Sequence, residues 1–172
     1  MSKVPFRSIV GSLLYAARAT RPDISQATIA LAQYNDCAGF GHFQAAKRCM
    51  RYLNGIPGKG IRYTRIGAGK VAKITAFSDS DWGDCRDTRK SITGYVIYMA
   101  NGPIIWRSKK QKSVAQSSCE AEYIAMAMCI SEICWLTQFL TELKVEFESP
   151  VEICVDNKAA IELAKNPIAH AR

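Results

Sequence analysis

Residues 73–84, KITAFSDSDWGD, predict a short β-strand that ends in acidic residues. The apolar content of its first half, Ile74–Phe77, is typical of a strand. Three acids follow where the chain runs into a Trp-Gly turn, namely Asp79, Asp81 and Asp84. Carboxylates at a strand end cost free energy if they are buried unpaired, so they usually face solvent or hold a cation. We therefore ask which other acids of the chain join them.

The composition fits one ordinary domain, or one domain with an appendage. The chain has 172 residues, of which 48% are hydrophobic and 22% are charged, which suits a real core and argues against disorder. It has no run of 18 apolar residues and no signal-like N-terminus, so we expect neither a membrane span nor secretion. Seven cysteines with no CxxC pair favour reduced intracellular thiols over a zinc site.

Charge is unevenly distributed along the chain. Residues 1–66 hold ten Lys or Arg against two acids, and residues 67–116 hold nine against four. Residues 117–172 reverse the sign, with four Lys or Arg against nine acids. A basic front and an acidic remainder suit a protein that grips a polyanion and handles it with carboxylates. A solvated basic surface is the alternative explanation.

The first 68 residues are expected to be mainly helical, and residues 69–172 to form a separate domain. Helices are predicted over residues 8–19, 23–34 and 42–53, and a short strand over 60–66. The third helix is expected to bury one apolar face, formed by Phe43, Ala46, Met50 and Leu53. Glycines at 67 and 69 mark the boundary, which we place near residue 68.

The second part alternates strands with one long helix. After the opening strand, we expect strands at 91–100 and 104–108, joined by an Asn101-Gly102 turn, with Pro103 favouring a sheet edge. A helix over 118–143, a strand over 151–155 and a helix over 158–165 follow. The long helix forms a crossover, so the last strand should lie parallel to a neighbour in the sheet, with the opening strand as the natural choice.

This pairing would bring Asp79 and Asp156 to matching ends of adjacent strands. Two carboxylates at such a short distance repel each other unless a cation binds both, and Mg²⁺ suits such a pair. Glu120 and Glu122 compete to be the third acid. A capping box that starts at Ser117 would occupy Glu120, which favours Glu122. The remaining acids of this region are expected to be turn and surface residues, namely Asp81, Asp84 and Asp87.

Several motifs in order resemble the end of the Pol polyprotein of copia-type LTR retrotransposons, where the reverse transcriptase ends and ribonuclease H follows. They are VGSLLY, TRPDI, AAKRCMRYLNG, FSDSDWGD, RKSITGYV, WRSKKQKSVAQSSCEAEYIA and CVDNKAAIELAKNP. The resemblance implies an α/β fold with a ribonuclease H-like mixed sheet, of strand order 3-2-1-4-5, preceded by a small helical connection. It also implies Mg²⁺-dependent (or Mn²⁺-dependent) cleavage of the RNA strand of an RNA–DNA hybrid. The family's catalytic and metal-binding acids match Asp79, Glu122 and Asp156.

The resemblance also implies partners and a site that is incomplete. The RNA–DNA hybrid would be gripped through its phosphates by basic residues, unless these form only a solvated turn, and the candidates are Arg107, Lys109, Lys110 and Lys112. The remainder of the Pol polyprotein would be a partner, in the cytoplasm or in a virus-like particle. In relatives, the segment after the His170 and Arg172 motif supplies a fourth acid and the fifth strand, so we expect impaired hydrolysis. The alternative is a non-catalytic nucleic-acid-binding remnant or a co-opted retrotransposon-derived protein.

Overall fold

The computed structural model describes residues 5–67, 70–85 and 87–166. Its contacts divide the chain into two compact units, Met1–Ile61 and Arg62–Arg172, each with a hydrophobic core of its own. The boundary predicted near residue 68 lies outside the described residues, as does the motif of His170 and Arg172.

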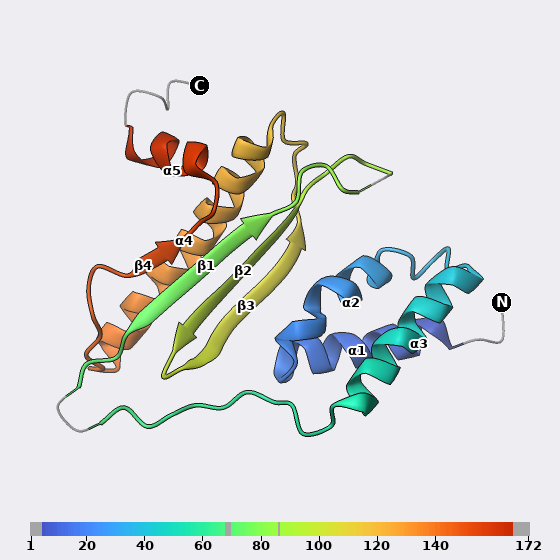
Figure 1. Ribbon diagram of the computed structural model, residues 1–172, viewed down its shortest axis with the longest axis horizontal. Helices are drawn as coiled ribbons and strands as arrows, with labels where there is room; N and C mark the ends of the chain where they lie inside the picture. Colours follow the sequence, from blue (N-terminus) through green and yellow to red (C-terminus); the bar gives the residue numbers. More distant parts are fainter. Residues whose placement is uncertain (1–4, 68–69, 86, 167–172) are drawn as a thin grey trace. The chain divides into compact units, whose positions relative to one another are not determined.

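The first unit is helical, as predicted. It contains α1 (Phe6–Ala19), the short 3-10 turn η1 (Pro22–Ile24), α2 (Ser25–Ala32) and α3 (Phe40–Gly55) (Figure 1). Its core includes Val10, Leu31 and Ala46. The expected apolar face of α3 is wrong at one position, because Met50 is 47% exposed and its neighbour Cys49 packs against the core instead.

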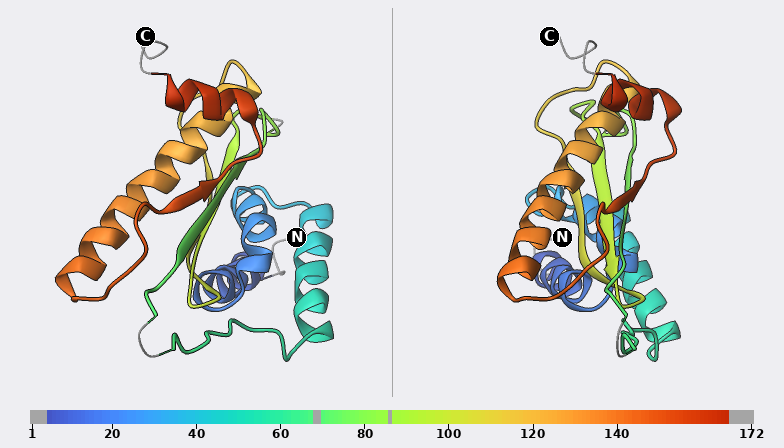
Figure 2. Two further views of the ribbon diagram at one scale, coloured as in Figure 1. Left: turned by 60° about the vertical axis from the view of Figure 1, so that its left-hand side comes forward. Right: turned by 90° about the vertical axis from the view of Figure 1, so that its left-hand side faces the viewer.

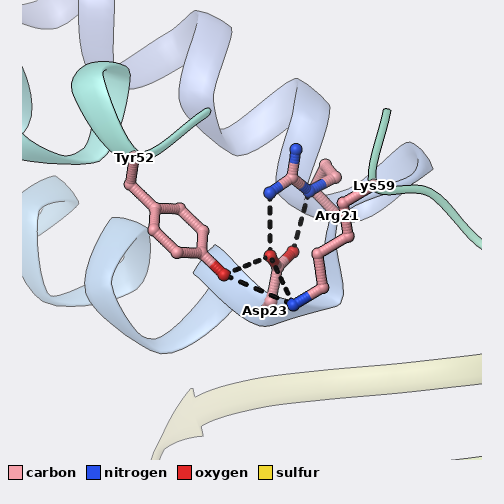
Figure 3. Close-up of polar contacts among 4 residues, drawn as sticks. All are labelled: Arg21, Asp23, Tyr52 and Lys59. Carbon is pink, nitrogen blue, oxygen red and sulfur yellow. Dashed lines mark hydrogen bonds and ion pairs between the residues drawn. The ribbon is translucent and has the colours of Figure 1, made fainter. Parts of the chain in front are cut away.

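A polar cluster joins the turn after α1 to the end of α3 (Figure 3). Asp23 accepts two hydrogen bonds from the guanidinium of Arg21, at 3.0 and 2.9 Å, and one from the hydroxyl of Tyr52 at 2.8 Å. Lys59 lies 3.8 Å from the same carboxylate. Arg21 is only 8% exposed, so Asp23 neutralises a cation that would otherwise be buried unpaired. These contacts hold the pKa of Asp23 down at about 2, chiefly through the hydrogen bonds from Arg21.

The second unit is built on a mixed sheet. Its described strands are β1 (Ile74–Ser80), β2 (Ile92–Met99), β3 (Gly102–Lys110) and β4 (Glu152–Cys154), in the order β3-β2-β1-β4. β1 pairs antiparallel with β2 and parallel with β4. The sequence prediction of this order and of the parallel pair is confirmed for these four strands, and β3 lies at the edge as Pro103 indicated. The described residues include no fifth strand.

The hairpin between β2 and β3 turns one residue earlier than predicted. Ala100 and Asn101, not Asn101 and Gly102, have the positive φ values of the turn, 55° and 61°. Gly102 is instead the first residue of β3, where the ring of Tyr63 lies against it, so that a Cβ there would come within 2.6 Å of Tyr63. The glycine is therefore required by close packing rather than by backbone conformation.

The strand predicted over 60–66 is wrong, because the described residues there are not part of the sheet. This segment instead runs beside the hairpin. Thr64 donates its backbone N–H to the carbonyl of Ala100 at 2.9 Å, and the Tyr63 hydroxyl donates to the carbonyl of Pro103 at 2.9 Å. The Thr64 hydroxyl also donates to the carbonyl of Ala100 and accepts from the Asn101 side chain. These contacts hold the segment without the ladder that a strand requires.

One face of the sheet is covered by α4 (Ser118–Glu142), and α5 (Lys158–Lys165) packs beside the first turns of α4 (Figure 2). The core between the sheet and α4 includes Ile74, Ile97 and Cys129. By length and composition alone α4 could cross a membrane, a test that the core helices of soluble proteins also pass. The helix is not buried on every side, since Cys129 is fully buried and the adjacent Ile130 is 41% exposed.

Candidate metal centre

Three acids from three elements meet at one end of the sheet. Asp79 lies in β1, Asp156 follows β4, and Glu122 lies near the start of α4, the end of the helix that reaches this edge (Figure 1). One carboxylate oxygen from each lies within 4.8 Å of the others. Among the described residues this is the only group of three or more potential metal ligands. The acids chosen from the sequence are thus brought together, and their metal-binding and catalytic roles stay predictions.

The parallel pair of strands explains why the two aspartates meet. Phe77 of β1 lies opposite Cys154 of β4, so two residues further along each strand the chain reaches Asp79 and Asp156. β4 ends at Cys154, and Asn157 then begins α5 as its cap, because its side-chain oxygen accepts the N–H of Ala160 at 3.1 Å. A strand and a helix cap on either side therefore hold Asp156 at the sheet end.

The start of α4 decides between the two glutamates. Ser117 caps the helix by accepting the N–H of Glu120 at 3.1 Å, as predicted. The Glu120 carboxylate accepts the N–H of Gln116 at 2.7 Å, one residue before the cap amide expected for a capping box. The Glu120 carboxylate is therefore engaged by a backbone N–H. Glu122, two residues further along α4, lies with the two aspartates instead.

Glu122 is a buried acid with half of its hydrogen-bonding capacity unused. The residue is 6% exposed, and its Oε1 accepts the backbone N–H of Ser80 at 3.2 Å. Its Oε2 is buried and has no hydrogen-bond partner among the described residues. The pKa of Glu122 is raised to about 6, chiefly by burial; the carboxylates of Asp79 and Asp156 contribute to the rise, and the hydrogen bond from Ser80 opposes it.

This arrangement suits a hard divalent cation. The three side chains offer only oxygen atoms, which Mg²⁺ and Mn²⁺ prefer. A cation beside the unpartnered Oε2 would satisfy a buried atom that otherwise costs free energy. Opposite ligands of one Mg²⁺ lie about 4.2 Å apart, so a spread of up to 4.8 Å lets the acids draw in around one ion or share two.

The neighbouring acids have other positions. The Asp81 carboxylate accepts the backbone N–H of Ile92 at 2.8 Å and so closes the base of the loop between β1 and β2. Asp84 and Asp87 are exposed and do not belong to the group of three. The loop acids thus lie where turn and surface residues are expected.

The four predicted phosphate-binding residues differ in their exposure and in the contacts that their side chains make. Arg107 lies 3.5 Å from the carboxylate of Glu132. Lys110 donates to the Cys85 thiol at 2.7 Å, and this contact is the main reason why the pKa of Cys85 falls to about 7. Lys109 is half-buried and Lys112 is exposed. Their role toward nucleic acid stays a prediction.

Sequence reasoning missed two groups at this edge. The N–H of Ser80 orients Glu122, and no sequence pattern could identify it because it is a backbone group. The indole N–H of Trp82 donates to the carbonyl of Ala115 at 3.2 Å, which ties the segment after β1 to the segment before α4. The only sequence signal for this tether was a tryptophan within the acidic turn.

Comparisons with known proteins point to retroelements. The chain is 44% identical over 167 residues, 97% of its length, to "Retrovirus-related Pol polyprotein from transposon RE1" of Arabidopsis thaliana. It is 41% identical over its full 172 residues to "Retrovirus-related Pol polyprotein from transposon TNT 1-94" of Nicotiana tabacum. The chain spans only 11% and 13% of these two proteins.

A much shorter protein is also similar. "Secreted RxLR effector protein 161" of Plasmopara viticola is 40% identical over 137 residues, which cover 80% of this chain and 94% of that protein. No protein-family model matches the chain, and no solved structure matches it significantly.

Proposed function

Because nearly the whole chain is 41% to 44% identical to retrotransposon Pol polyproteins, we propose that it belongs to the copia-type family of these polyproteins and that its second unit is a ribonuclease H module. In this proposal it cleaves the RNA strand of RNA–DNA hybrids during reverse transcription, with Mg²⁺ or Mn²⁺ as cofactor. The observation that carries it is the convergence of Asp79, Glu122 and Asp156 at one end of the β3-β2-β1-β4 sheet.

The residues of the chain would hold the cation and fix its position. Asp79 and Asp156 are exposed and can follow a bound ion, whereas Glu122 is held by Ser80 and offers its free Oε2 from a buried side. A bound pair of divalent ions would activate a water and stabilise the leaving oxygen of the scissile phosphate. Contacts with 2′-hydroxyl groups would select the RNA strand. The proposal places the protein inside the cell, in the cytoplasm or a virus-like particle, with the rest of the polyprotein.

Two measurements on the 172-residue chain test this function. The first is cleavage of a hybrid labelled on the RNA strand, in Mg²⁺ and in Mn²⁺, beside a DNA duplex. Three acids meet among the described residues, whereas the resemblance implies a site of four, so cleavage is expected to be slow. The second measurement is therefore Mn²⁺ binding, by titration calorimetry. Asp79→Asn and Asp156→Asn should each abolish cleavage and weaken Mn²⁺ binding at least tenfold.

Asp84→Asn is the matched control, because Asp84 is an exposed acid of the same region outside the group of three. It should leave both readouts unchanged. Equal Mn²⁺ affinity in the wild type and in Asp79→Asn would overturn the metal centre, and cleavage of DNA duplex at the same rate as hybrid would overturn the choice of substrate.

The second candidate is a co-opted protein without catalysis. The short Plasmopara viticola relative, matched over 94% of its length and named a secreted effector, favours it. This candidate would be selected over the nuclease by two results together. The wild type cleaves hybrid with neither metal, and Asp79→Asn still binds hybrid.

A further inference from the structure

Trp82 combines a tethered edge with an open face. Its indole N–H donates to the carbonyl of Ala115 at 3.2 Å, yet 56% of the residue is exposed. A tryptophan N–H usually finds a partner when the residue is buried. Here the polar edge is satisfied by the protein and the apolar face is left in solvent, three residues after Asp79.

The loop that carries Trp82 is held at several points. Asp81 accepts the N–H of Ile92 at 2.8 Å, and the N–H of Gly83 donates to the Ser91 hydroxyl at 3.0 Å. Gly83 has a φ of 63°, a conformation that favours glycine directly after the tryptophan. The ring is thus oriented before any ligand arrives, so little side-chain entropy remains to be lost on binding.

The tether also relates Trp82 to both sides of the metal centre. On one side is β1 with Asp79, and on the other is the segment that leads through Ala115 and Gln116 into α4 and Glu122. Val114, the neighbour of Ala115, is itself 51% exposed. Each of the two segments that flank the acids therefore carries an exposed apolar side chain.

We propose that Trp82 is a substrate-contact residue, whose open ring face packs against the sugar or base of a nucleotide bound at the three acids. This inference rests on the proposed function. The lysines would recognise the charge of a phosphate directly, and the acids would do so through a bound cation. That charge is the same at every phosphate. An aromatic face instead contacts the apolar part of a nucleotide and holds the strand in place without selecting its sequence.

Binding measurements separate this role from a purely structural one. Affinity for an RNA–DNA hybrid is measured by fluorescence anisotropy in EDTA, so that no cleavage occurs. Trp82→Leu loses both the ring and the tether, while Trp82→Phe keeps a ring and loses the N–H. We expect Trp82→Leu to weaken binding by about 5- to 140-fold, the range of one stacking contact, and Trp82→Phe to stay within about threefold.

Trp135 provides the matched control. It is also 56% exposed, but it lies on α4, 13 residues after Glu122, or about 20 Å along the helix. It stacks on Phe139. Trp135→Leu should leave hybrid affinity unchanged. Equal losses in Trp82→Phe and Trp82→Leu would show that only the tether matters and would overturn the contact.

A spectroscopic readout follows the ring directly. In protein labelled with 5-fluorotryptophan, the ¹⁹F resonance missing from Trp82→Phe belongs to Trp82, and it should shift when hybrid is added while the Trp135 resonance stays in place. A shift without any cleavage would retain the contact and remove the nuclease. Cleavage with an unshifted Trp82 resonance would overturn the contact alone, whereas a complete absence of hybrid binding would overturn both the contact and the proposed function.

Discussion

The carboxylate of Glu122 in α4 accepts the backbone N–H of Ser80 in β1 across 3.2 Å. The residue next to Ser80 is Asp79, so this hydrogen bond fixes the distance between two of the three acids. It also leaves the other oxygen of Glu122 buried and without a partner among the described residues. The site is therefore oriented in advance, at a cost in free energy when no cation is present.

This cost predicts how stability of the metal-free protein depends on pH. The pKa of Glu122 rises on folding from its ordinary 4.5 to about 6, so the folded state binds the proton more tightly. Stability should fall as the pH rises from about 4.5 to about 6, by roughly 2 kcal/mol. Glu122→Gln should remove this component and be the more stable protein at pH 7, as measured by urea denaturation in EDTA. In Asp84→Asn the dependence should persist, and an unchanged pH profile in Glu122→Gln would contradict the prediction.

The helical unit should show the opposite dependence. The pKa of Asp23 falls on folding from 3.8 to about 2, so its contribution of roughly 2 kcal/mol is present above pH 4 and is lost as the pH falls toward 2. Asp23→Asn should destabilise α1 to α3 by about that amount at pH 7. All three tryptophans lie in the second unit, so tryptophan fluorescence does not report on the helical unit. Hydrogen exchange of the amides in α1 to α3 is therefore the suitable measurement.

Asp36→Asn is the control for Asp23. Asp36 also pairs with an arginine, Arg7, but both side chains are highly exposed. Such a surface pair contributes little to stability. Equal losses in the two variants would show that the polar cluster of Figure 3, with its buried Arg21, has no special role.

Gly102 should tolerate no side chain. A Cβ would lie 2.6 Å from the ring of Tyr63 and 2.7 Å from the carbonyl oxygen of Arg62, which is backbone and cannot easily move. Gly102→Ala should therefore destabilise the second unit by about 1–3 kcal/mol, measured by thermal unfolding. Gly94→Ala, also within a strand, has its nearest contact at 3.8 Å and should cost less. A Gly102→Ala protein as stable as Gly94→Ala would refute the packing argument.

The basic residues should contribute unequally to nucleic-acid binding. Lys112 is exposed, so Lys112→Ala should lower affinity for hybrid and reduce the slope of log affinity against log salt concentration by about one. Arg107 is near Glu132, which offsets its charge, so Arg107→Ala should change the slope less. Salt titrations of the two variants at equal hybrid concentration test this order, and identical slopes in both variants and the wild type would exclude phosphate contacts by either residue.

Much of the architecture was readable from local pattern. The helices α4 and α5 begin at the predicted positions, and the cap predicted at Ser117 is present, because a cap is a contact between near neighbours in the chain. The parallel placement of β4 beside β1 followed from the crossover rule, and with it the meeting of Asp79 and Asp156. Glu122 could be favoured over Glu120 for the same local reason.

The tertiary structure decided what depends on contacts between distant segments. The turn lies at Ala100 and Asn101, and Gly102 instead begins β3, where Tyr63, 39 residues away in the chain, packs against it. The position of Glu122 depends on the N–H of Ser80, and the exposure of Trp82 depends on the carbonyl of Ala115. Backbone groups are the same in every residue, so a sequence can indicate which acids a site uses, but only the folded chain determines which amides and carbonyls hold them in place.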